Sequence, residues 1–271
     1  MAELGNVTFA TADPAALARF WATVLGYEIQ EAPPDFMEHW LAAGRDPNGA
    51  AAAVDPRGDG PRLFFNKREK TPTIELPIHL DVNVVDPDAE VERLLGVGAK
   101  LVVRRTIAIG DFSEGWTVMR DPERNGFCVQ GPDTQRAAPG PFIRNITFAG
   151  ADPEGLAAFW AEALGYEREE RGGGDELLAA GLDPAELNAH VALAHPEGGR
   201  RPRLFFHRRE KTRTTEIPIH LDLRAEERDS EVERLTGLGA TVVEEKTRTT
   251  GPYEEAWTVM RDPEGNAFCV Q

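Results

Sequence analysis

The stretch that decides the fold is NVTFATADPAALARFWATVLGYE at residues 6–28, which returns as NITFAGADPEGLAAFWAEALGYE at residues 145–167. Its first letters alternate between polar and apolar residues, which predicts a strand with one apolar face. Asp13 and Pro14 then supply an N-cap and a first-turn proline, and apolar residues follow at helical spacing as far as Gly26. Each copy therefore opens with a strand and an amphipathic helix.

The repeat extends along the whole chain. RLFFNKREKT (62–71) returns as RLFFHRREKT (203–212), and WTVMRDPERNGFCVQ (116–130) returns as WTVMRDPEGNAFCVQ (257–271). A repeat of this length is a duplicated domain rather than a unit of a solenoid. We therefore predict two domains, 1–131 and 142–271, joined by a linker at 132–141.

Within each copy the order of strand, helix and further strands occurs twice. In the first copy the second round begins with an alternating strand at residues 78–84. It ends with a hairpin around RDPERN (120–125), in which proline takes the second position of the turn. The sequence therefore predicts an α+β fold in which each domain holds two βαβββ modules.

Charge and cysteine content narrow the class of partner. The chain carries 46 acidic and 30 basic residues, a formal net charge of −16. Such a chain is repelled by phosphate backbones and anionic lipids, so we expect neither nucleic acid nor membrane as a partner. No apolar run reaches the roughly 20 residues of a membrane-spanning helix, the first residues lack a secretion pattern, and Cys128 and Cys269 suit a reducing compartment. We expect a cytoplasmic protein that binds a cationic or neutral small molecule, as a monomeric pseudo-dimer or a homodimer.

Three repeated motifs carry a family resemblance. The opening NxxFxxxDPxxLxxFW, the HLD inside each copy and the closing DPExNxFCV resemble the glyoxalase/bleomycin-resistance/dioxygenase superfamily, also called the vicinal-oxygen-chelate proteins. Within it they are similar to the glyoxalase-like branch that is common in actinobacteria. The resemblance covers nearly the whole chain, and it implies two tandem glyoxalase-like domains, in each of which the two βαβββ modules form a curved mixed sheet around a cavity. It implies no single activity, because the superfamily includes isomerases, epimerases, dioxygenases, thiol transferases and binding proteins without activity.

The resemblance also implies at which positions of this sequence the ligands of a metal ion would stand. Metal-using members hold their ion with a His from the first strand of each module and a Glu from the last strand. The first module of each copy ends at Asn66 or His207, without a carboxylate. Because glyoxalase-type divalent ions prefer His and carboxylate ligands, we predict no metal and no other cofactor; an exception would be an open zinc site at His207, His220 and Cys269. The matching first-strand positions hold Asn6, His79, Asn145 and His220, and the last strands of the second modules hold Cys128 and Cys269.

The segment PIHLD occurs once in each copy and carries the candidate catalytic residues. His79 and Asp81 share one face of a strand, as do His220 and Asp222, because side chains two positions apart point the same way. A histidine oriented by an aspartate can act as a general base near neutral pH. Alternatively, the two side chains simply satisfy each other within the sheet.

Further residues are candidate ligand contacts. The segment APPDFMEHWLAAG (32–44) is aromatic, whereas its counterpart ERGGGDELLAAG (170–181) is not, so either one copy has a lid or a surface loop has drifted. The cysteines are either nucleophiles activated by the histidines or small buried hydrophobes. The tryptophans of the WTVM strands can lie on either sheet face. The candidate ligand-binding residues are Asn6, Phe36, His39, Trp40, Trp116, Cys128, Asn145, Trp257 and Cys269.

Two classes of function remain open. The first is a metal-independent small-molecule-binding protein, such as one that sequesters a drug or natural product in the manner of a resistance protein. The second is a metal-independent lyase, isomerase or hydrolase that uses the His–Asp pair as base and orienting group. A metal-dependent enzyme resembling lactoylglutathione lyase is a third alternative.

Overall fold

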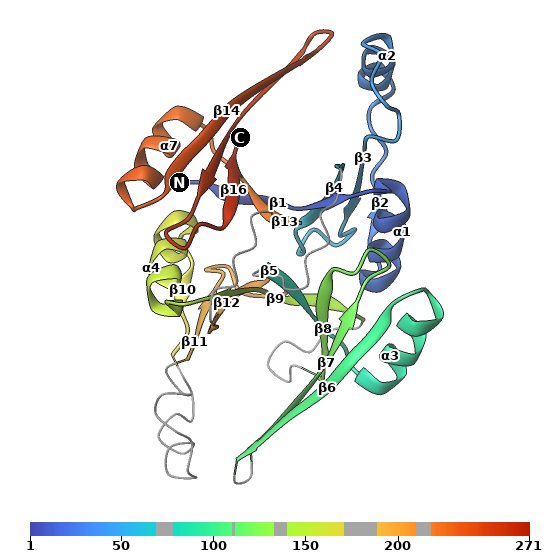
Figure 1. The fold of residues 1–271 in the computed structure, drawn as a ribbon, viewed down its shortest axis with the longest axis vertical. Coiled ribbons are helices and arrows are strands. Elements are labelled where there is room, and N and C mark those ends of the chain that lie inside the picture. The colour runs from blue at the N-terminus through green and yellow to red at the C-terminus, as the bar shows by residue number, and fades with distance from the viewer. Residues whose placement is uncertain (69–77, 110–111, 133–139, 171–188, 210–217) are drawn as a thin grey trace.

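The structure is a computed structural model of the chain, and it describes all residues except 69–77, 110–111, 133–139, 171–188 and 210–217. Most of the predicted linker and of the segment 170–181 therefore lies outside the described residues. The elements follow the predicted order of four βαβββ modules (Figure 1). A further helix, α2, lies between the second and third strands of module 1.

Each half of the chain contributes two modules. Module 1 consists of β1 (Glu3–Thr11), α1 (Pro14–Leu25), β2 (Glu28–Ile29), α2 (Pro34–Ala42), β3 (Ala50–Val54) and β4 (Arg62–Lys67). Module 2 consists of β5 (Ile78–Asn83), α3 (Pro87–Gly96), β6 (Lys100–Ile109), β7 (Phe112–Arg120) and β8 (Gly126–Gln130). Module 3 consists of β9 (Phe142–Gly150), α4 (Pro153–Leu164), β10 (Glu167–Arg168), β11 (His190–Ala194) and β12 (Arg203–Arg208). Module 4 consists of β13 (Ile219–Arg224), α7 (Arg228–Gly237), β14 (Thr241–Thr250), β15 (Tyr253–Arg261) and β16 (Ala267–Val270). None of the helices that the structure describes is long and apolar enough to cross a membrane.

The modules pair across the two halves of the chain. Sheet A joins module 1 to module 4 in the order β14-β15-β16-β13-β1-β4-β3-β2, and sheet B joins module 2 to module 3 in the order β10-β11-β12-β9-β5-β8-β7-β6. The modules meet at antiparallel pairings of β1 with β13 and of β5 with β9. The predicted α+β class is confirmed, with two mixed eight-stranded sheets. Each sheet takes one module from each half of the chain, whereas the resemblance implied that the two modules of one domain form a sheet; the order of the sequence does not distinguish the two arrangements.

Helix α1 holds the two modules of the first half together. Its fully buried Trp21 lies against Phe9 of sheet A and Phe127 of sheet B, with ring centroids 5.5 and 5.2 Å away. The indole Nε1 donates a hydrogen bond of 3.3 Å to Asp121, which follows β7. Trp160 of α4 makes the equivalent contacts in the second half. The helices therefore join the sheets within each half, while the strands join the halves.

The first helix begins where the sequence predicts. The Asp13 side chain accepts a hydrogen bond of 3.0 Å from the Ala16 N–H, and Gly26 ends the helix in the left-handed conformation, at φ 67°. Because such a cap stabilises a helix by about 1 kcal/mol, we expect Asp13→Ala to lower the free energy of unfolding in urea by about that amount. Glu227 takes the N-cap position of α7 without a side-chain cap bond, so Glu227→Ala is the matched control. Equal losses in the two variants would contradict the assignment of the cap.

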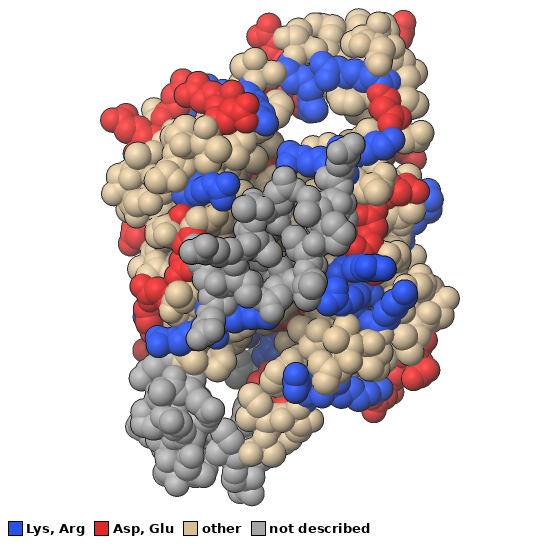
Figure 2. All heavy atoms as spheres, in the orientation of Figure 1, with Lys and Arg blue, Asp and Glu red and all other residues tan. Residues whose placement is uncertain are grey.

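The predicted lid segment is a short helix rather than a loop. Helix α2 has no buried residue and lies against the hairpin of β14 and β15. The Phe36 ring is 5.4 Å from that of Tyr253, and Arg45 donates a hydrogen bond of 3.1 Å to the Thr249 carbonyl. The first half of the chain thus reaches the hairpin that ends sheet A. Figure 2 shows an opening between this contact and the body of the protein, edged mainly by Lys and Arg side chains.

Candidate functional site

The two PIHLD strands, β5 and β13, lie where the modules meet. Across β5 and β9 the register pairs His79 with Thr147 and Asp81 with Asn145, and β8 places Cys128 beside Asp81. These residues share one face of sheet B, because the alternating apolar residues of β5 are buried on the face that the helices cover. We call this group of five residues site B.

Site A is the equivalent group in sheet A. Its members are Asn6 and Thr8 of β1, His220 and Asp222 of β13, and Cys269 of β16. The two sites therefore have the same five residue types in the same register. Each combines two strands from one half of the chain with one strand from the other half: β5 and β8 with β9 in site B, and β13 and β16 with β1 in site A.

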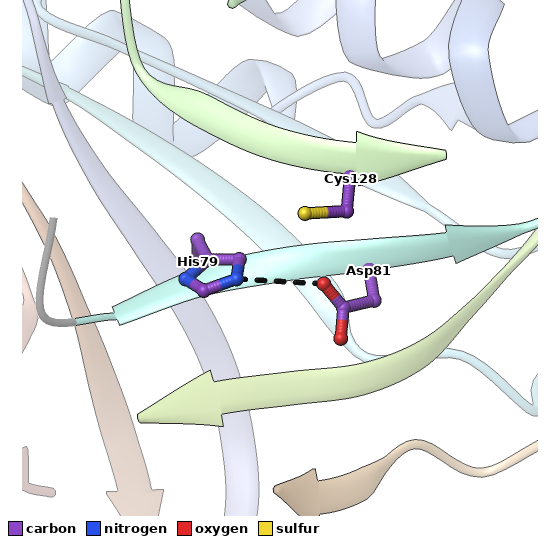
Figure 3. Close-up of side chains that lie close together, drawn as sticks. All are labelled: His79, Asp81 and Cys128. Carbon is purple, nitrogen blue, oxygen red and sulfur yellow. Dashed lines mark ion pairs between the residues drawn. The ribbon is translucent and has the colours of Figure 1, made fainter. Parts of the chain in front are cut away.

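A hydrogen-bond network fixes the aspartate of site B. Asn145 Nδ2 and Thr147 Oγ1 both donate to Asp81 Oδ2, over 2.8 and 2.7 Å. Arg203 Nε donates to Asn145 Oδ1 over 2.9 Å, which settles the orientation of the amide. Because both donors bind Oδ2, the other oxygen, Oδ1, faces His79 Nε2 at 3.5 Å (Figure 3).

The same network forms in site A. Asn6 Nδ2 and Thr8 Oγ1 donate to Asp222 Oδ2 over 3.0 and 2.6 Å, and Arg62 donates to Asn6 Oδ1 over 2.9 Å. His220 Nε2 lies 3.2 Å from Asp222 Oδ1. Burial raises the pKa of Asp222, but the interactions with His220, Thr8 and Asn6 outweigh it and leave the pKa below its ordinary value. Asp222 is therefore ionised at neutral pH.

Burial sets the protonation of the other groups. It lowers the pKa of His79, against the charge of Asp81, so the imidazole is neutral at pH 7. Burial and then Asp81 raise the pKa of Cys128 well above its ordinary value, and burial and then Asp222 raise the pKa of Cys269 to about 12. Both thiols are therefore protonated in the protein as described. The protonated thiols favour the interpretation of the two cysteines as small buried hydrophobes over their interpretation as activated nucleophiles.

His207 lies beside site B in sheet B, and not with His220 and Cys269 in sheet A, with which it was expected to form a zinc set. In β12, Leu204 and Phe206 are buried, so His207 lies on the other sheet face. Its ring centroid is 6.3 Å from that of His79. Burial, together with the neighbouring His79, lowers the pKa of His207 to about 4. The expected set is thus divided between the two sheets, because the sequence does not show that β12 pairs into the sheet of β5.

The tryptophans of the WTVM strands lie on the same sheet faces as the two sites. Trp116 is opposite Gln130, two positions from the pair of Val118 with Cys128, and Trp257 has the equivalent place in β15. In α2, the ring of Trp40 contacts two guanidinium groups, that of Arg45 at 4.9 Å and that of Arg248 at 5.3 Å from the ring centroid. Arg248 also lies over Trp257, at 5.6 Å. The lid residues Phe36, His39 and Trp40 are therefore connected to sheet A through its outer hairpin.

The metal ligands that the resemblance implies do not fit these sites. The two asparagines use their amides within the networks, and Cys128 and Cys269 stand where a glutamate is required. A hard ion therefore lacks the oxygen ligands that it prefers. A different set is brought together instead. In His79, Asp81 and Cys128, and again in His220, Asp222 and Cys269, the three donor atoms lie within 4.8 Å of one another.

Sequence reasoning missed four members of the networks. Thr8 and Thr147 stand two positions after the two asparagines, and Arg62 and Arg203 open the two RLFF segments. Each is identical in both copies. The threonines share a strand face with the asparagines, and the arginines lie opposite the asparagines on the neighbouring strand. That combination of repetition and spacing was the signal that could have identified them.

Comparison with known proteins gives the family. A family model described as "Glyoxalase-like domain" matches residues 6–130 and again residues 145–271. Among solved structures, the chain is similar to glyoxalase I from Zea mays, at 13% identity and a TM-score of 0.65, over 100% of this chain and 92% of that one. It is also similar to a putative dioxygenase from Bacillus subtilis, at 15% identity and a TM-score of 0.60, over 99% and 84% of the two chains. At these identities the likeness shows the fold alone. No curated protein matches the sequence.

Proposed function

The chain belongs to the glyoxalase-like domain family, with one copy of the domain in each half, and we propose that it binds a small molecule at each of two equivalent sites, A and B. The observation that carries this proposal is the duplicated network that fixes Asp81 and Asp222. Buried polar groups are costly unless they are hydrogen-bonded, and here the same two hydrogen bonds hold the Oδ2 atom of the buried aspartate in both sites. In each site it orients a histidine whose side chain is still 19% or 12% exposed, a group that a ligand can touch.

Charge near site A favours a neutral or anionic ligand over the cationic one suggested by the acidic composition. Arg68 and Lys246 lie close enough to Cys269 to act on its pKa, in the direction opposite to burial and Asp222. Lys and Arg side chains also edge the opening below α2 (Figure 2). Local cations attract anions even where the whole chain is negative. Binding without conversion would make the protein a sequestering protein for a drug or natural product.

Variants of the two histidines test the proposal. We expect a ligand found by thermal-shift screening of a natural-product library to bind with two equivalents per chain, as measured by native mass spectrometry. His79→Ala should remove one equivalent and His220→Ala the other, because each histidine borders one site. Trp40→Ala should weaken the site A equivalent alone. A ligand that retains both equivalents in the double histidine variant would bind elsewhere and would contradict the proposal.

The fixed histidine also favours a second function, that of a metal-independent lyase, isomerase or hydrolase. With Nε2 of His79 facing Asp81, the other ring nitrogen, Nδ1, is the one that a substrate proton can reach. In this case catalytic amounts of protein convert the ligand. Asp81→Asn combined with Asp222→Asn should then lower kcat far more than it raises KM. Stoichiometric binding without product would exclude this function.

A further inference from the structure

We propose that site A takes a planar aromatic anion as its ligand, a proposal that rests on the small-molecule function and names the class of molecule. The ring of this ligand lies against a group of four residues that we call the outer subsite. They are Trp40 and Arg45, from α2 and the segment that follows it, and Arg248 and Trp257, from the hairpin of β14 and β15. Figure 2 shows the opening beneath α2, with Lys and Arg side chains along its edges.

The aromatic rings and guanidinium groups of the outer subsite lie against one another. The Trp40 ring has Arg45 at 4.9 Å and Arg248 at 5.3 Å from its centroid, and Arg248 also lies 5.6 Å from the centroid of Trp257. Glu255 accepts two hydrogen bonds from Arg248, over 2.6 and 2.8 Å, which fix the plane of the guanidinium group. Both indoles are only half-buried. A flat ring can therefore stack on an indole face or on a guanidinium plane, a contact that an aliphatic chain does not make.

Two arginines near the opening lack a carboxylate partner. Arg45 donates a hydrogen bond of 3.1 Å to the carbonyl of Thr249, which is a neutral acceptor. Arg68, which follows β4, has an exposed side chain. Neither arginine forms an ion pair with any residue that the structure describes. A carboxylate on the ligand supplies the missing partner, because a guanidinium group can bind it through two parallel hydrogen bonds.

The outer subsite is continuous with site A along β15. Cys269 of site A is opposite Val259, and Trp257 stands two positions further along the same face, a distance of about 7 Å. Lys246 is opposite Trp257 on β14. Arg68 and Lys246 both act on the pKa of Cys269, so their charges lie near the thiol. A ring on Trp257 thus has its acidic group within the field of two cations.

Site B has a similar inner cation but not the outer subsite. Arg209 follows β12 as Arg68 follows β4, and it acts on the pKa of His79. On the hairpin of sheet B, however, Ile107 stands at the position that Arg248 occupies on β14, each opposite a glutamate. The segment 170–181 also lacks a counterpart of Trp40. We therefore expect the planar anion at site A alone.

Three probes with the same ring and different charge test this inference. They are 2-naphthoate, which is an anion, 2-naphthamide, which is neutral, and 2-naphthylmethylammonium, which is a cation. In isothermal titration calorimetry of the full chain, 2-naphthoate should bind with one equivalent and at least about tenfold more tightly than the other two. Added salt should weaken the binding of 2-naphthoate and leave that of 2-naphthamide unchanged, because screening acts only on the charged probe.

Three variants assign the binding to its residues. Trp40→Ala and Arg68→Met should each weaken the binding of 2-naphthoate about tenfold, by loss of the stack and of the charge respectively. Arg209→Met removes the equivalent arginine beside site B and is the matched control, which should bind 2-naphthoate as the wild-type chain does. All three side chains are exposed or half-buried, and near-ultraviolet circular dichroism should confirm that the variants are folded.

The proposal is overturned by absence of 2-naphthoate binding, by equal affinity for the three probes, or by unchanged binding in Trp40→Ala. A larger loss in Arg209→Met than in Arg68→Met also overturns it, because the anion would then lie at site B. None of these results decides whether the chain binds small molecules at two sites. That function is judged separately, by the stoichiometry of the library ligand in the double histidine variant.

Discussion

Residues 1–131, expressed alone, should form a homodimer and not a folded monomer. In the full chain β1 pairs with β13 and β5 pairs with β9, so this fragment loses both partners and exposes two strand edges. An exposed edge is a template for pairing with another chain. Since β13 is the repeat of β5 and β9 is the repeat of β1, the β1 strand of one copy can pair with the β5 strand of the other.

The dimer should also rebuild both sites. Asn6 and Thr8 are the same residue types as Asn145 and Thr147, so each dimer would contain two complete networks around Asp81. Light scattering after size exclusion should give twice the mass of the fragment. Thr8→Asp should prevent dimer formation, because it sets a second carboxylate against Asp81. A folded fragment monomer, with the near-ultraviolet circular dichroism of the full chain, would contradict the pairing across halves.

Trp21→Ala should be the most destabilising single substitution that we predict. The indole is fully buried between aromatic rings of both sheets and donates to Asp121. Replacing a buried tryptophan by alanine costs about 3 to 5 kcal/mol, a large part of the roughly 5 to 15 kcal/mol that stabilises an ordinary domain. Urea unfolding should show this loss at an unchanged m-value.

Two variants separate the causes of that loss. Trp21→Phe keeps most of the apolar contact and removes the hydrogen bond, so it should lose about 1 to 3 kcal/mol. Trp40→Ala removes a tryptophan from α2, a helix without buried residues, and should leave the free energy of unfolding nearly unchanged. A loss below about 1.5 kcal/mol in Trp21→Ala would contradict the role of this residue in joining the modules.

The positions of the helices and strands could be predicted well from the sequence. Which strand pairs with which could not be predicted at all. The strand before Asp13, the helix up to Gly26 and the hairpin at RDPERN all follow from local patterns that hold in the structure. Pairing of β1 with β5 or with β13 would bring the same residue types into the same register. Nothing in one sequence distinguishes these alternatives, because both satisfy the same side chains.

The site was predicted only in part, because its residues depend on the same strand pairing. The His and Asp of each PIHLD were placed correctly on one strand face, and each has the cysteine of its own copy beside it. The asparagine beside each pair comes from the other half of the chain, which the sequence did not show. Helix α2 was taken for a loop, because nine residues without a core face do not form a stable helix by themselves. Helix α2 contacts Tyr253, which is far away in the sequence, and a local sequence pattern cannot show such a contact.

The pairing across halves also constrains when the protein can fold. Asn6 and its partner Asp222 are 216 positions apart, so β1 emerges from the ribosome long before β13 exists. At roughly 5 to 20 residues per second, the interval is about 10 to 40 seconds. Until then the β1 edge stays unpaired, whereas β5 can pair with β9 as soon as module 3 has been synthesised. Sheet A closes only when the last module has been synthesised, and until then the open β1 edge can pair with another nascent chain.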